Sequence, residues 1–225
     1  MISIAIDGPA GAGKSTIAKQ VAQDLGYIYV DTGAMYRAIG LYVYRLGKNT
    51  SDENVVGECL PNINIEIKYT PEDGQRIFLC NEDVSQAIRQ PEISMAASNV
   101  SAMSEVRKFL FELQRSTALK SNIIMDGRDI GTVVLPNAQI KLFLTADLVE
   151  RAQRRYDELI EKGETVTYEY VLEDIRQRDY NDTNRAVAPL KQADDAILID
   201  TTGSTLEDST ALVERIIKER LKNVL

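Results

Sequence analysis

Histidine is absent from this 225-residue sequence. Without an imidazole the chain cannot carry a serine–histidine–aspartate triad, a histidine metal site or a histidine acid–base step. Cysteine is scarce as well, because Cys59 and Cys80 are the only two and no C-x-x-C spacing occurs. Two such thiols favour a reduced, cytoplasmic protein over a disulfide-bonded or zinc-binding one.

Long apolar runs and an excess of basic residues are also missing. No stretch approaches the roughly 18 apolar residues of a membrane helix, and the start MISIAIDGPAG lacks the basic region of a signal peptide. A net charge of −8 and a pI near 4.8 argue against nucleic-acid polymers and membrane surfaces as partners. We expect a cytoplasmic monomer, since no long apolar surface stripe is left unassigned.

Short apolar segments alternate with helical patterns along most of the chain. The predicted strands cover residues 2–6, 27–30, 122–126, 140–145 and 196–200. The predicted helices cover roughly 14–25, 34–47, 104–119, 147–161, 168–182 and 205–222. This order predicts an α/β fold, a doubly wound, five-stranded parallel sheet with right-handed crossovers. Residues 62–89 break it, because INIEIKY, the turn TPEDG and QRIFLC predict a small antiparallel hairpin insert.

The strongest motif is GPAGAGKS, residues 8–15, which matches the P-loop pattern G-x-x-x-x-G-K-[ST]. A strand precedes it and a helix follows, as a phosphate-binding loop requires. Lys14 would reach the β- and γ-phosphates, and the Ser15 hydroxyl would hold Mg²⁺. Asp126, at the end of a predicted strand, is a candidate to accept hydrogen bonds from the ligands of the Mg²⁺ ion. An ordinary strand-terminal turn is the alternative.

A P-loop alone leaves kinases, GTPase switches and motor ATPases open. GTPases need a guanine-reading N-K-x-D motif, which this chain lacks. DTTG at 200–203 fits D-x-x-G, but it precedes the last predicted helix, so we interpret it as a strand end and a helix cap.

Two further motifs follow predicted strands, where ligands bind in such sheets. DTGAMYR (31–37) places Thr32 and Arg37 there, and DGRDIGTVV (126–134) places Arg128 and Asp129 there. Plain helix caps and tight polar turns are the alternatives.

Arginines also gather on two later helices. Arg151, Arg154 and Arg155 share one face, which predicts either a lid that closes over phosphates or a surface ion-paired with nearby glutamates. In DIRQRDYNDTNRAVAP (174–189), Arg178, Asp182 and Arg185 continue the apolar face of the preceding helix if that helix persists so far. The one-face interpretation requires that helix to stay regular through 181–184.

Taken together, IAIDGPAGAGKST, DTGAMYR, DGRDIGTVV, RAQRR and RDYNDTNRAVAPL resemble, in this order, the P-loop nucleoside monophosphate kinases and especially the bacterial cytidylate kinases. The resemblance covers essentially the whole chain and implies Mg²⁺-dependent transfer of the ATP γ-phosphoryl group to CMP or dCMP. It also implies a core of about 1–30, 100–146 and 186–225, a monophosphate-binding region of about 31–99 and a lid of about 147–185.

The resemblance further implies a role for each motif residue. ATP would contact Gly8, Pro9, Ala10, Gly11, Ala12, Gly13, Lys14, Ser15, Thr16 and Arg154. CMP would contact Thr32, Arg37, Ser98, Arg107, Arg128, Asp129, Arg178, Asp182 and Arg185. The catalytic set would be Lys14, Arg128, Arg151, Arg155 and Arg185.

The chemistry of the acceptor is consistent with this implication. A monophosphate has a second pKa of about 6, so its attacking oxygen is anionic at neutral pH and needs no base. Capturing two polyanions calls for arginine, which outnumbers lysine by 15 to 11 in an acidic chain. A kinase for UMP or AMP and a nucleotide-binding regulatory module are the remaining alternatives.

Overall fold

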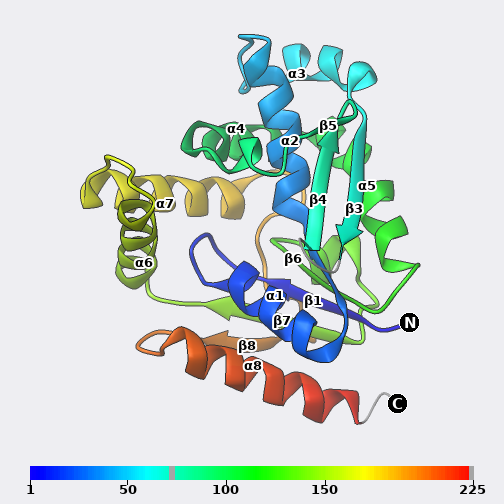
Figure 1. Ribbon diagram of the computed structural model, residues 1–225, viewed down its shortest axis with the longest axis vertical. Helices are drawn as coiled ribbons and strands as arrows, with labels where there is room; N and C mark the ends of the chain where they lie inside the picture. Colours follow the sequence, from blue (N-terminus) through cyan, green and yellow to red (C-terminus); the bar gives the residue numbers. More distant parts are fainter. Residues whose placement is uncertain (71–73, 223–225) are drawn as a thin grey trace.

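A five-stranded parallel sheet forms the centre of the protein (Figure 1). The computed structural model describes residues 1–70 and 74–222. The strand order is β2-β6-β1-β7-β8. In that order the strands span Ile28–Asp31, Ile123–Gly127, Ser3–Asp7, Ile140–Thr145 and Ile197–Asp200. The predicted doubly wound parallel sheet is confirmed, and every strand lies within one residue of its predicted bounds.

Different helices cover the two faces of the sheet, because successive side chains of a strand point to opposite sides. On β1, Ile4 belongs to a core cluster with α1 (Lys14–Leu25) and α8 (Leu206–Leu221). Its neighbour Ala5 belongs to the cluster that contains α5 (Ser104–Ala118). Burial on both faces explains why the strands are continuous apolar runs.

An inserted region of helices and a small sheet lies on the α5 side. It contains α2 (Thr32–Arg45), α3 (Glu53–Cys59), α4 (Pro91–Ser101) and an antiparallel sheet β3-β4-β5 (Ile65–Thr70, Gly74–Leu79, Glu82–Asp83). Short 3₁₀ turns occupy Leu60–Asn62 and Ala87–Arg89. The predicted hairpin is confirmed, although residues 71–73 of its predicted turn lie outside the described residues.

The inserted region shares its core with the sheet. One hydrophobic cluster runs from Met125 in β6 through Ile39 in α2 to Ile77 in β4 and Ile93 in α4. Helices α3 and α4 were not predicted. The first has only seven residues, whereas the second buries Ile93, Ala96 and Val100 at helical spacing, a signal that could have predicted it.

The α6–α7 arm, by contrast, has a hydrophobic core of its own. Helices α6 (Leu148–Glu161) and α7 (Tyr168–Asn184) bury Ala152, Leu159 and Val171 against each other. Helix α7 is unbroken two residues beyond its predicted end, so the regular helix through 181–184 is confirmed. Arg185 is the C-cap and has an extended backbone, so its predicted place on the helix face is wrong. Figure 1 shows α6 at the outer end of this arm, whereas α7 runs back from it and contacts α4.

The separate core of the arm leads to a stability prediction. Leu159→Ala should lower the free energy of local unfolding of the α6–α7 arm by about 2–5 kcal/mol. Amide hydrogen exchange should therefore accelerate in α6 and α7 while the protection of β1 is unchanged.

The matched control is Val213→Ala, which creates a cavity in the hydrophobic core beneath α8. That variant should lower the midpoint of global unfolding. Equal loss of protection in β1 and α6 for Leu159→Ala would contradict a separate arm core.

Candidate active site

The P-loop connects β1 to α1 at the middle of the sheet. Gly8 adopts φ +149°, and a Cβ atom there would lie 1.9 Å from the carbonyl oxygen of Leu144. Gly13, at φ +77°, is the N-cap of α1 in a left-handed conformation. The loop therefore needs glycine at both positions, and it directs the N-terminus of α1 at the space above the sheet, where an anion is favoured.

Lys14 is buried at the start of α1. Its Nζ donates a 2.7 Å hydrogen bond to the carbonyl oxygen of Pro9. Burial, together with repulsion from Arg128, lowers the pKa of Lys14 to about 7. An incoming polyanion would favour the charged form, so the lysine is prepared to gain a proton with its ligand.

Asp126, at the end of β6, accepts hydrogen bonds from hydroxyl groups of neighbouring elements. Its carboxylate accepts from Ser15 Oγ at 2.7 Å and from the Tyr29 hydroxyl at 3.1 Å, and its backbone carbonyl accepts from Thr32 Oγ1 at 2.8 Å. Burial, with a contribution from the charge of Asp31, raises the pKa of Asp126 to about 6. A hydroxyl and a carboxylate beside a P-loop are suitable oxygen ligands for a hard divalent cation.

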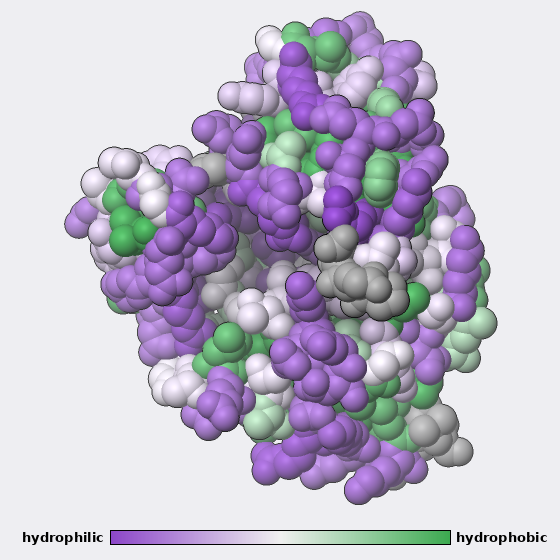
Figure 2. Space-filling view, viewed as in Figure 1, coloured by the Kyte–Doolittle hydropathy of each residue, from purple (hydrophilic) through white to green (hydrophobic). Residues whose placement is uncertain are grey.

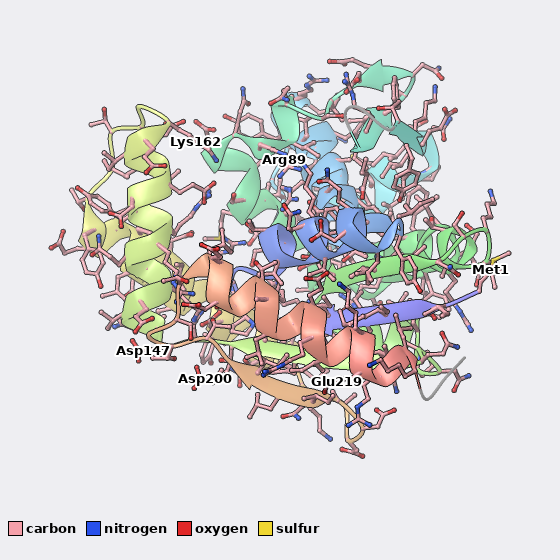
Figure 3. The ribbon with its side chains drawn as sticks, turned by 60° about the horizontal axis from the view of Figure 1, so that its bottom comes forward. Met1, Arg89, Asp147, Lys162, Asp200 and Glu219 are labelled. Atoms are coloured by element: carbon pink, nitrogen blue, oxygen red, sulfur yellow. The ribbon has the colours of Figure 1, made fainter. Side chains whose placement is uncertain are left out.

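Asp31 is the last residue of β2, and its carboxylate holds the side chain of Arg37 in place. Its carboxylate caps α2 by accepting from the backbone N–H of Ala34 at 3.0 Å. Arg37, one turn into α2, donates to the same carboxylate at 2.6 Å. Arg89 approaches Asp31 to 3.8 Å from the segment before α4, and Figure 3 shows it opposite Lys162 at the end of α6.

A network of alternating charges continues from the end of β6. Arg107 pairs with Asp129 and donates to the carbonyl oxygen of Ser101 at 3.1 Å. Arg185 lies 3.3 Å from the other oxygen of Asp129 and 3.7 Å from Asp182. Arg128 Nε donates to Asp182 at 2.7 Å. Each aspartate thus orients two guanidinium groups.

Two more predicted residues complete this end of the cleft. Arg178 contacts Asp174 at 3.7 Å, and burial together with repulsion from Arg128 lowers its pKa. The Ser98 hydroxyl is buried and has no hydrogen-bond partner among the described residues. Both side chains would gain from a polar or anionic ligand.

The three predicted lid arginines take different positions. Arg154 donates to the carbonyl oxygen of Thr201 at 2.9 Å, and Arg155 pairs with Glu158 at 2.8 Å; both line the cleft. Arg151 is instead buried beneath the P-loop, where it donates to Ala10 O at 2.8 Å and pairs with Asp179 at 2.7 Å. Arg151 is not one of the described residues that line the cleft.

These groups surround one cleft of about 620 Å³. Figure 2 shows the molecule hollowed between the α6–α7 arm and the inserted region, with mostly hydrophilic residues around the opening. Eight of the 15 arginines line it, namely Arg37, Arg89, Arg107, Arg128, Arg154, Arg155, Arg178 and Arg185. An acidic protein that concentrates arginine in this way binds anions, and the P-loop at one end adds a phosphate site.

A model of the cytidylate kinase family matches residues 4–220. The chain belongs to this family. Cytidylate kinase from Caldicellulosiruptor bescii is 51% identical over 223 residues, covering 99% of this chain and 98% of that protein. Cytidylate kinase from Caldanaerobacter subterraneus subsp. tengcongensis is 53% identical over 222 residues, covering 99% and 96%.

A solved structure shows the same fold at low sequence identity. An uncharacterized protein from Eubacterium ventriosum superposes with a TM-score of 0.53 at 14% identity, covering 97% of this chain and 99% of that one. Within the described residues, the helices are all too short or too polar to cross a membrane. As a member of the cytidylate kinase family, the chain is a nucleoside monophosphate kinase.

Sequence reasoning missed several residues of this kinase site. Asp7 accepts from the backbone N–H groups of Ile130 and Gly131 at 2.8 and 2.7 Å, and Tyr29, Asp31 and Arg89 were not proposed. The two aspartates end strands immediately before GPAGAGKS and TGAMYR, so their positions were a usable signal. No periodicity marks Arg89.

The lowered pKa of Lys14 predicts proton uptake on binding of a nucleoside triphosphate such as ATP. Between pH 7 and the ordinary lysine pKa of 10.5, the free protein holds Lys14 increasingly neutral, whereas the bound phosphates favour the ammonium form. Affinity should therefore fall as pH rises above about 7. Calorimetry at pH 8 in two buffers of different ionisation enthalpy should show uptake of nearly one proton.

Lys14→Met should abolish this uptake, and Lys19→Met, at an exposed position of α1, should preserve it. Binding to the unmodified protein at pH 8 without proton uptake would refute the lowered pKa.

Proposed function

We propose that the chain transfers the γ-phosphoryl group of ATP to CMP or dCMP in a Mg²⁺-dependent reaction, releasing ADP and CDP or dCDP. The observation that carries the proposal is the single cleft that joins the P-loop to the Arg107–Asp129–Arg185 network. Family membership supports the same activity.

The P-loop end is proposed to hold ATP. The backbone of residues 8–16 would surround the phosphates with the N–H groups of every residue except Pro9, and Lys14 would exchange its bond to Pro9 for the β- and γ-phosphates. Arg154, held at the loop after β8, would lie beside the nucleotide. Ser15 and Asp126 would hold Mg²⁺, which when bound neutralises charge on the phosphate oxygens.

The opposite end is proposed to hold the monophosphate. Arg37, Arg128 and Arg185 would bind its phosphate, since each guanidinium is already oriented by an aspartate. Arg178 and Asp182 would contact the sugar hydroxyls, and Thr32 would lie nearby. The acceptor's phosphate oxygen then attacks the γ-phosphorus, and the bond to the bridging oxygen of ADP breaks.

Cytosine recognition is proposed for Ser98, Arg107 and Asp129. Cytosine presents an exocyclic amine donor next to the acceptors N3 and O2. The Asp129 carboxylate, held between two guanidinium groups, accepts from the amine while Arg107 donates to the ring acceptors. Uracil has N3–H and O4 in reversed order, so the same pair would be mismatched.

Transfer between two polyanions depends on positive charge in a site from which water is excluded. Arg155 on α6 is proposed to act from the lid, together with Lys14, Arg128 and Arg185. Arg151 would contribute through the P-loop backbone, which it contacts. The division into core, monophosphate-binding region and lid is proposed at the boundaries expected from the sequence, and the monomeric state and cytoplasmic location stay predictions.

A coupled ADP-release assay tests the function. With ATP and Mg²⁺, CMP and dCMP should give at least tenfold higher kcat/KM than UMP, AMP or GMP, because only cytosine matches the Asp129–Arg107 pair. Chelation should abolish turnover and added Mg²⁺ should restore it. Higher efficiency with UMP or AMP would assign another acceptor, and tight ATP binding without monophosphate-stimulated turnover would indicate a regulatory module.

Asp129→Asn tests base recognition directly. The amide can donate where the carboxylate only accepts, so the ratio of kcat/KM for CMP to that for UMP should fall about tenfold to a hundredfold. The KM for ATP should change little. Asp24→Asn, at an exposed position of α1, is the matched control. Equal losses for CMP and ATP would show that Asp129 is only structural.

A further inference from the structure

Gln75 joins the inserted hairpin to the edge of the parallel sheet. It is the second residue of β4, and its side-chain amide pairs with the backbone of Asp31 at the end of β2. The Asp31 N–H donates to Gln75 Oε1 at 2.7 Å, and Gln75 Nε2 donates to the Asp31 carbonyl oxygen at 3.1 Å. Because β2 is an edge strand, the amide supplies the two hydrogen bonds that a further strand would have made.

The residue held in this way aims an arginine into the cleft. The same Asp31 caps α2 through Ala34 and binds Arg37 at 2.6 Å. Side-chain exposure is 8% for Asp31 and 21% for Arg37, so this ion pair is largely shielded from water. A shift of the Asp31 backbone would therefore move both the start of α2 and the Arg37 guanidinium.

The hairpin reaches Asp31 from outside the cleft. Asp31 and Arg37 line the cleft, whereas none of the described hairpin residues 65–70 and 74–79 does so. Figure 1 shows β4 beginning next to the parallel sheet and running away from it toward β5. Among the described residues, the hydrogen bonds of Gln75 that lead to the cleft are the two to Asp31.

We propose that Gln75 is a positioning residue, through which the inserted hairpin fixes Asp31 and so holds the Arg37 guanidinium in register with the acceptor's phosphate. This inference rests on the proposed phosphate-binding role of Arg37. It gives the insert a specific task in the reaction, namely preorganising the monophosphate end of the cleft.

The structure offers a matched control for simple attachment of the hairpin. Arg45, at the C-terminal end of α2, makes two hydrogen bonds of 2.7 and 2.9 Å with Glu82 in β5. This exposed pair also ties the hairpin to α2, but it lies at the far end of both elements from Asp31. Loss of Arg45 would loosen attachment without touching the Asp31–Arg37 pair.

The test is a double-mutant cycle on steady-state kinetics. Gln75→Met keeps the length of the side chain and removes both hydrogen bonds to Asp31. It should raise the KM for CMP about tenfold and leave the KM for ATP nearly unchanged. Arg45→Gln should leave both KM values unchanged. In an Arg37→Ala background, Gln75→Met should have no further effect on the KM for CMP.

Three results would overturn the proposal. They are an unchanged KM for CMP in Gln75→Met, an equal effect of Arg45→Gln, and a full tenfold effect that persists without Arg37. Failure of the proposed function is a separate outcome, because it appears in the unmodified enzyme as preference for another monophosphate. The same cycle would then be measured with that acceptor.

Discussion

Concentration of arginine in one cleft is the constraint on which the rest of the structure depends. Guanidinium groups repel one another when they are brought together away from water, so they need acidic partners before any substrate arrives. Asp31, Asp129 and Asp182 meet this need, and each lies within 4 Å of two arginines that line the cleft. The network holds the arginines in place while leaving donors for phosphate oxygens.

Strand ends supply the fixed points of this network. Asp7, Asp31 and Asp126 each belong to the last two residues of a neighbouring parallel strand, so the sheet sets their spacing. Each carboxylate also accepts from a backbone N–H or a hydroxyl: Asp7 from Ile130 after β6, Asp31 from Ala34 in α2, and Asp126 from Ser15 in α1. The charge pattern at the cleft is therefore inherited from the most rigid part of the fold, as preorganised phosphoryl transfer requires.

Sequence alone predicted what depends on local pattern. Strands buried on both faces, the P-loop between β1 and α1, and the helical continuity from Val171 to Asp182 each leave a periodic signal. The position of Arg151 leaves none, because its i, i+3, i+4 spacing with Arg154 and Arg155 also fits an exposed lid face. Its burial beneath Ala10 results from the packing of α6 on the P-loop, where Gly11 approaches Arg151 and Ile175. The π-helical turn Ile130–Val134 was likewise unpredictable, since it depends on acceptors supplied by Asp7 more than 120 residues away.

The two elements added to the sheet act on it in the same way. The hairpin forms hydrogen bonds with the backbone of Asp31 through Gln75. The α6–α7 arm forms hydrogen bonds with the backbone of Ala10 through Arg151 and Asp179. Neither contact uses a side chain of the loop that it supports. Backbone contacts of this kind fix where a strand ends while leaving the loop's own side chains available for ligand. The hairpin thus supports the monophosphate end from outside the cleft, whereas the arm supports the P-loop and also contributes Arg155, Arg178 and Asp182 to the lining.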